Sequence, residues 1–192
     1  MQFAHHALSC YRLKEELAKQ GLPHDWNVGW NESLVTRARN EMAKTFLDSE
    51  WSHLFWLDAD IEFEPEDVAK IWNMDADIGV AFYCMKQKAK PLSAWKDGKL
   101  VEITDQKEPF EVDYAGTGFM SIKRAVFEKL MPTTEWYIGP QGKTYGFFMT
   151  PITDHKFERG LFLLPEGEGS WLQGHWRPHD KTRPLRALSL RK

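Results

Sequence analysis

The stretch His53-Leu54-Phe55-Trp56-Leu57-Asp58-Ala59-Asp60-Ile61-Glu62-Phe63 decides the expected fold. An apolar run that leads into two carboxylates is typical of a buried strand that ends at a site, because interior strands read as continuous apolar runs. Asp58 and Asp60 are two residues apart, so on an extended backbone they point to one side of the strand. There they could share one hard divalent cation, directly or through water.

The segment after this strand allows a second interpretation of the Asp-x-Asp pair. Residues 64–67 (EPED) open a predicted helix, with Pro65 in its first turn and acidic side chains near the positive end of its dipole. In that case the Asp-x-Asp pair occurs by chance and merely caps that helix. Both interpretations are kept.

The bulk composition fits one cytoplasmic globular domain. The 192 residues are 42% hydrophobic, and no apolar run approaches the length of a membrane span. Cys10 and Cys84 lie far apart in apolar surroundings and lack the spacing of zinc ligands, so we expect reduced thiols. Residues 159–192 carry seven Lys or Arg against three Asp or Glu, but they show no recognition motif, so nucleic acid is not an expected partner.

Two amphipathic helices are predicted before the Asp-x-Asp strand. The first carries an apolar stripe from residue 3 to residue 17 and stops at Gly21, and its two histidines, at positions 5 and 6, are expected in solvent. The second begins near Asn31 or Ser33, either of which could be its N-cap. Arg37 and Asn40 share a face of it, where they form either a cradle for a nucleotide diphosphate or an ordinary charged surface.

The segments after the strand predict a crossover unit and a hairpin. A helix with Val68, Ile71 and Trp72 inward precedes a buried strand over residues 77–85, which is the connection found in parallel sheets. Asp97-Gly98 marks a tight turn in a hairpin over residues 92–104.

A glycine pair follows in Gly116-Thr117-Gly118, before a helix over residues 123–130 with Val126, Phe127 and Leu130 inward. Such glycines either let the backbone approach a ligand closely or form a β-bulge.

Three segments, in this order, resemble glycosyltransferases of the GT-A fold, most closely short single-domain forms of phages, viruses and bacteria. They are residues 31–40 (NESLVTRARN), 57–66 (LDADIEFEPE) and 115–124 (AGTGFMSIKR). The resemblance covers roughly residues 4–158. It implies an α/β/α sandwich around a mostly parallel central sheet, and a sugar transfer from a nucleotide-diphosphate donor, such as a UDP- or GDP-sugar, to the hydroxyl of a glycan or other acceptor.

The resemblance also implies roles for single residues. Asp58 and Asp60 would hold Mn²⁺ or Mg²⁺ against the donor diphosphate, where the metal acts as a Lewis acid. The nucleotide would lie by Asn31, Arg37 and Asn40, as well as by the two aspartates. Gly116, Thr117 and Gly118 would line the pocket for the donor sugar or the acceptor. Trp95 either stacks on a sugar or belongs to the core.

The chain departs from the family pattern at both ends. The first strand of the family is missing, and after Glu158 there is neither the late Glu-Asp pair nor the strand followed by Gly-His. We therefore expect a GT-A-like domain over residues 1–158 and an atypical basic tail over residues 159–192, which a frameshift explains. No catalytic base is identified. His155 and His175 could each take the place of the family's metal-binding histidine, but neither lies in the sequence context that the family has around it.

Two other functions remain open on these residues. A relative that binds a nucleotide or glycan without turnover is favoured by the missing acidic pair. A nucleotidyltransferase also uses paired carboxylates with Mg²⁺, but the chain has no glycine-rich basic phosphate loop.

Overall fold

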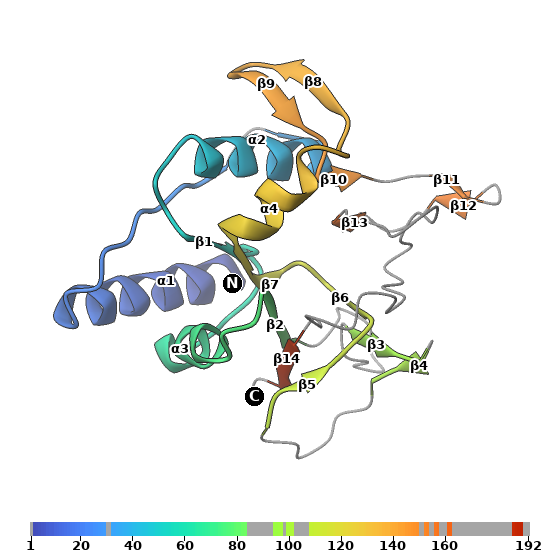
Figure 1. The fold of residues 1–192 in the computed structure, drawn as a ribbon. Coiled ribbons are helices and arrows are strands. Elements are labelled where there is room, and N and C mark those ends of the chain that lie inside the picture. The colour runs from blue at the N-terminus through green and yellow to red at the C-terminus, as the bar shows by residue number, and fades with distance from the viewer. Residues whose placement is uncertain are drawn as a thin grey trace. The chain divides into compact units, whose positions relative to one another are not determined.

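The computed structural model describes residues 2–29, 32–83, 94–97, 99–101, 108–149, 152–153, 156–157, 161–162 and 186–189, which form a mixed α/β protein (Figure 1). This confirms the α/β class. The chain divides into two compact units. Unit 1 contains Met1–Trp26, Phe55–Ser121 and Arg183–Lys192, and unit 2 contains Asn27–Leu54 and Ile122–Thr182. Both units draw on residues after position 158, where the basic tail was expected to begin.

Unit 1 begins with helix α1 (Gln2–Lys19), as the apolar stripe predicts. The helix ends in a Schellman motif. The Leu22 N–H donates to the Leu17 carbonyl at 3.0 Å, and the Gly21 N–H donates to the Ala18 carbonyl at 3.1 Å. Gly21 has φ +65°, which glycine adopts without steric cost, so the predicted stop at Gly21 is confirmed.

Helix α3 (Pro65–Asn73) also begins as predicted, with proline in its first turn. A capping box closes its start, in which Asp67 Oδ2 accepts the Glu64 N–H at 3.1 Å. Ile71 is buried, but the expectation that Trp72 faces the core is wrong, since Trp72 is 53% exposed. Its ring instead stacks on Phe55, with centroids 6.4 Å apart, at the edge of the apolar face.

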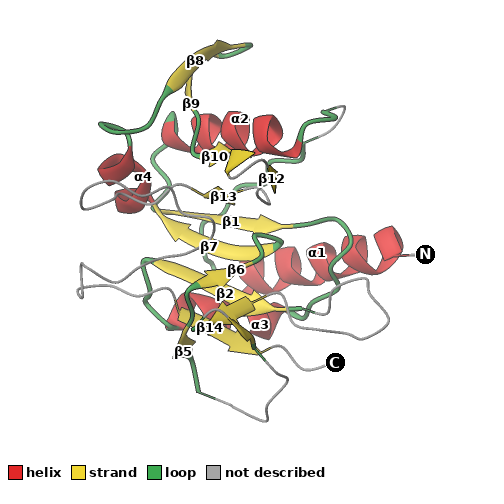
Figure 2. Ribbon diagram, turned by 90° about the vertical axis from the view of Figure 1, so that its right-hand side faces the viewer, coloured by secondary structure: helices red, strands yellow, loops and turns green. Residues whose placement is uncertain are grey.

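A five-stranded sheet has the order β1-β7-β2-β14-β5. Its strands are β1 (His53–Leu57), β7 (Phe119–Lys123), β2 (Ile78–Phe82), β14 (Arg186–Ser189) and β5 (Phe110–Glu111). Strand β14 lies between β2 and β5 in Figure 2, parallel to β2 and antiparallel to β5. The hydrogen bonds Asp58 N–Gly118 O and Arg124 N–Ser52 O at the two ends of β1 and β7 give these neighbours opposite directions.

The expected mostly parallel central sheet is therefore not found. Apolar runs in the sequence mark the buried strands β1 and β2 correctly, but they carry no information on strand direction. Strand β7 returns beside β1 in the opposite direction. On the edge of β2 away from β7, the neighbouring strand is β14, which comes from the segment expected to be an atypical tail.

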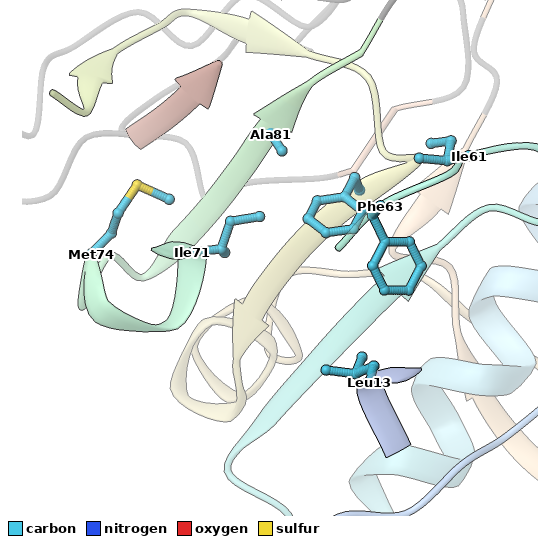
Figure 3. Packing of buried hydrophobic residues seen from close by; sticks show 7 residues of the cluster. Leu13, Ile61, Phe63, Ile71, Met74 and Ala81 are labelled. Atoms are coloured by element: carbon cyan, nitrogen blue, oxygen red, sulfur yellow. The ribbon is translucent and has the colours of Figure 1, made fainter. Parts of the chain in front are cut away.

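The core of unit 1 lies where α1, α3 and the sheet meet. Figure 3 shows Ile71 of α3 and Met74, the C-cap of that helix, close to β2, which carries Ala81. Leu13 of α1 belongs to the same cluster. Phe63 packs on Phe119 with ring centroids 5.3 Å apart. The core thus encloses the segment that follows Asp58 and Asp60 in the chain.

A smaller antiparallel sheet of order β4-β3-β6 completes unit 1. It contains β3 (Ala94–Lys96), β4 (Lys99–Leu100) and β6 (Tyr114–Ala115). Strands β3 and β4 form the predicted hairpin, and Asp97 in its turn has φ +51°. The hairpin at Asp97 is thereby confirmed over the described residues.

Unit 2 is built on helices α2 (Val35–Leu47) and α4 (Arg124–Leu130). Val126, Phe127 and Leu130 of α4 are buried, as predicted. Its antiparallel pairs are β8 (Trp136–Gly139) with β9 (Gly142–Tyr145), β10 (Phe148–Met149) with β13 (Leu161–Phe162), and β11 (Ile152–Thr153) with β12 (Lys156–Phe157). In the described part of the chain no helix is long and apolar enough to cross a membrane.

Candidate functional site

The Asp-x-Asp pair lies on a turn and not on a strand. Strand β1 ends at Leu57, and the Ile61 N–H donates to the Asp58 carbonyl at 3.0 Å, which closes a turn over Asp58, Ala59 and Asp60. The expectation of an extended backbone over the two aspartates is therefore wrong, and their sharing of one cation stays a prediction. Asp58 starts the turn and Asp60 is its third residue, and both are half-buried.

Helix α1 holds the segment that follows this turn. Ser9 Oγ accepts the Phe63 N–H at 3.0 Å, and His6 Nδ1 donates to the Ile61 carbonyl at 2.8 Å. Cys10 Sγ lies 3.3 Å from His6 Nε2. Burial raises the pKa of the Cys10 thiol, so the thiol keeps its proton and can donate it in a hydrogen bond to His6 Nε2. The expectation that His6 is solvated is therefore wrong.

The sequence offered one signal for this contact. Position 6 lies four residues before Cys10 and seven before Leu13, which are members of the buried stripe of α1. His5, by contrast, is exposed as expected and lies 3.5 Å from the Glu62 carboxylate.

The structure places the glycine turn (Gly116, Thr117 and Gly118) next to the aspartate turn (Asp58, Ala59 and Asp60). The Asp58 N–H donates to the Gly118 carbonyl at 2.8 Å, and the Gly118 N–H donates to the Tyr83 hydroxyl at 3.0 Å. A Cβ atom on Gly118 would lie 2.6 Å from the Tyr83 hydroxyl and 2.8 Å from Ile61 Cδ1. Because Gly118 has no side chain, its backbone can lie close to its neighbours, which in this structure are Tyr83 and Ile61. Tyr83 follows β2, and the sequence did not single it out.

Gly118→Ala is expected to destabilise the protein by about 1–3 kcal/mol, because Tyr83 and Ile61 must both move to admit the new methyl group. Urea denaturation followed by circular dichroism measures the change. Gly142→Ala is a useful contrast, since nothing lies within 4 Å of its Cβ position and only its φ of +98° opposes the substitution. If Gly118→Ala combined with Tyr83→Leu is no more stable than Gly118→Ala alone, the clash with Tyr83 is not the cause.

The start of α2 differs from the prediction. Asn31 lies outside the described residues, and the N-cap is Leu34, which makes no side-chain cap, so Ser33 is not the cap either. Glu32 serves this helix end instead. Its carboxylate accepts the Leu34 N–H at 2.9 Å and two bonds from Arg37, at 2.6 and 2.9 Å. The hydrogen bond from Arg37 lowers the pKa of Glu32, so the pair stays charged, and Arg37 is already engaged by a carboxylate.

Asn40 has a structural role that the sequence did not reveal. Its side chain is buried, donates to the Phe148 carbonyl at 3.1 Å and accepts the Phe148 N–H at 2.8 Å. Both ends of the amide thus bind the backbone of β10. These two bonds give Asn40 a structural role as a clamp, which could not be predicted before its neighbour Phe148 was known. Its place beside a nucleotide stays a prediction.

Another polar contact joins α2 to the hairpin β8–β9. The Tyr137 hydroxyl donates to Glu41 Oε1 at 3.1 Å, and burial together with this bond raises the pKa of Tyr137 to about 12. Glu41 Oε2 is buried and has no hydrogen-bond partner among the described residues. A Cβ on Gly139 would lie 2.1 Å from Glu41 Oε1 and 2.9 Å from Thr144 Oγ1, so a larger residue there would force the Glu41 side chain out of its present position.

The predicted site residues fall in both units. Asp58, Asp60 and residues 116–118 belong to unit 1, where the hydrogen bond between Asp58 and Gly118 joins two of the predicted segments, whereas Arg37 and Asn40 belong to unit 2. Trp95 is half-buried in the small sheet of unit 1, paired with Leu100 and Tyr114. His155 and His175 lie outside the described residues.

The chemistry available at the aspartate turn is that of two carboxylates. Among the residues that the structure describes, no group of three or more His, Cys, Asp or Glu side chains could hold a metal ion. Mg²⁺ is commonly bound by one or two carboxylates, with water and substrate phosphates as its other ligands. Asp58 and Asp60 therefore fit a cation that arrives with a phosphate-bearing ligand.

Comparison with known proteins gives little similarity. No family model matches the chain, and no curated protein matches it. Among solved structures, the chain is similar to the crystal structure of A197 from STIV, with 22% sequence identity and a TM-score of 0.46. The similarity covers 68% of this chain and 65% of that chain.

Proposed function

We propose that this protein is a metal-dependent glycosyltransferase related to the GT-A family that three of its segments resemble. It transfers a sugar from a UDP- or GDP-sugar to the hydroxyl of a glycan or other acceptor. The observation that carries the proposal is the 2.8 Å hydrogen bond from Asp58 N to Gly118 O. It joins the aspartate turn to the glycine turn, which are two of the three segments that resemble this family.

Asp58 and Asp60 would hold Mn²⁺ or Mg²⁺ against the donor diphosphate. When bound, the cation supplies a Lewis acid that stabilises the charge on the departing nucleoside diphosphate. The protein contributes two half-buried carboxylates on a closed turn, whose following residues Ile61 and Phe63 are fixed to α1. Because the backbone of the turn is held in this way, it needs little reorganisation when a diphosphate and its cation arrive.

The glycine turn would line the pocket for the donor sugar or the acceptor. Gly118 brings the backbone close to the Tyr83 hydroxyl, and Thr117 beside it is half-buried. Cys10 is a free thiol, in keeping with a cytoplasmic enzyme. The nucleotide contacts of Asn31 and Arg37 remain predictions.

The proposal is tested by calorimetric titration with UDP and GDP, each with and without Mn²⁺. We expect nucleotide binding to require the cation, and the cation to bind tightly only with nucleotide, because two carboxylates leave most of its ligands to water and phosphate. Asp58→Ala and Asp60→Ala are each expected to weaken binding by about tenfold or more, the loss of one charge-assisted contact.

Glu62→Gln is the matched control. It removes an exposed carboxylate that lies just after the same turn and pairs with His5 on the surface. This substitution should leave nucleotide affinity unchanged. Equal losses of nucleotide affinity in all three variants would show that affinity depends only on the total negative charge near the turn, and would contradict the proposal. Hydrolysis of a nucleotide-sugar would support transfer, metal-dependent binding without turnover would support a non-catalytic relative, and preference for a nucleoside triphosphate would support a nucleotidyltransferase.

A further inference from the structure

The hairpin β8–β9 has two different faces. In its register Trp136 pairs with Tyr145, Tyr137 with Thr144, and Ile138 with Lys143. Side chains alternate between the faces of a strand, so Tyr137 and Thr144 share the face toward α2, where Thr144 is fully buried. Trp136, Ile138, Lys143 and Tyr145 share the opposite face.

This opposite face is apolar and open to solvent. Trp136 is 55% exposed and Ile138 is 74% exposed. Lys143 Nζ lies 4.8 Å from the ring centroids of both Trp136 and Tyr145, so the ammonium group steadies both rings. Tyr145 packs in turn on the buried Phe147, with centroids 5.6 Å apart. The result is an aromatic platform fixed to the core of unit 2.

A pocket of about 550 Å³ adjoins this platform. The residues that line it include the aromatic Trp136 and Tyr145 and the polar Thr133, Glu135 and Lys143. The pocket is wide open to solvent and its accessible lining is mostly polar, which suits a ligand that is rich in hydroxyl groups.

We propose that this platform and pocket bind a neutral sugar ring of the acceptor glycan. The apolar C–H face of a sugar stacks on an exposed tryptophan ring, and its hydroxyl groups both donate and accept hydrogen bonds. Lys143 supplies a donor 4.8 Å from the Trp136 ring centroid, and Glu135, which also lines the pocket, carries an acceptor. Because one positive and one negative side chain line the pocket, it favours a neutral ligand over a phosphate or a cationic peptide.

This inference deepens the proposed function, on which it rests, by naming a carbohydrate as the acceptor. It can nevertheless fail independently. The glycan contacts lie within unit 2, and the titration with UDP, GDP and Mn²⁺ tests the aspartate turn of unit 1.

The test is saturation-transfer NMR on the full chain with cellobiose, maltose, chitobiose and mannobiose, without nucleotide or metal. We expect at least one disaccharide to bind. Trp136→Ala should weaken that binding by about fivefold to tenfold, whereas Trp136→Phe, which keeps a ring for stacking, should retain most of it. Circular dichroism of each variant confirms that the hairpin change leaves the protein folded.

Trp72→Ala is the matched control, because Trp72 is 53% exposed on α3, close to the 55% of Trp136. Trp72→Ala should leave disaccharide binding unchanged. The inference is overturned if no disaccharide binds, if Trp72→Ala weakens binding as much as Trp136→Ala, or if sedimentation velocity shows a self-associated chain that Trp136→Ala separates. Metal-dependent UDP or GDP binding with no disaccharide binding would overturn the inference alone, and the opposite result would overturn the proposed function alone.

Discussion

Phe127→Ala is expected to lower the free energy of unfolding by about 3–5 kcal/mol. Phe127 is fully buried in α4, and its ring lies 5.6 Å from that of Phe46 and 5.1 Å from that of Phe147. Alanine removes the aromatic ring from the centre of this group. The cost combines lost burial with a cavity that two rigid neighbouring rings cannot fill.

Urea denaturation of Phe127→Ala and the parent chain gives this difference. Val35→Ala on α2 is the control, because Val35 is 63% exposed and its truncation should change stability by no more than about 0.5 kcal/mol. A loss below about 1 kcal/mol for Phe127→Ala would contradict the packing described for unit 2.

Asn40→Ala is expected to cost about 2–4 kcal/mol. The substitution removes two hydrogen bonds to the Phe148 backbone and leaves space beside the buried Phe148. Asn40→Asp should also destabilise, because the carboxylate can still accept the Phe148 N–H but, when ionised, opposes the Phe148 carbonyl at the position of the former donor.

Thermal unfolding of both variants measures this effect, with Asn73→Ala at the exposed end of α3 as the control. The same samples also decide between the clamp and a nucleotide role. If Asn40→Ala keeps the parent stability and loses only UDP or GDP affinity, Asn40 serves the ligand and the clamp is wrong.

Local features of this fold could be predicted from sequence because their causes are local. The stop of α1 at Gly21 needs only a glycine with positive φ after an apolar stripe, and the start of α3 needs only Pro65 and the pair Glu64 and Asp67. The burial of Phe127 in α4 follows from helical spacing alone. Each depends on residues within about two helical turns.

Features that depend on distant partners could not be predicted. Strand direction depends on which segments become neighbours, and β14 from residues 186–189 is not marked by any period in the tail. His6 and Asn40 read as surface residues because their partners, Ile61 and Phe148, lie far along the chain. At the candidate site, the sequence indicated Asp58 and Gly118 but missed Tyr83, whose only signal was its place at the end of a strand.

The way in which the chain is shared between the two units has a consequence for biosynthesis. The chain passes from one unit to the other at residues 26–27, 54–55, 121–122 and 182–183, and β2 finds its parallel neighbour only in Arg186–Ser189. During translation β2 leaves the ribosome long before β14 and waits with one edge unpaired. We therefore expect unit 1 to complete its folding only after residues 186–189 have left the ribosome, and its folding to be the step at which chaperones matter most.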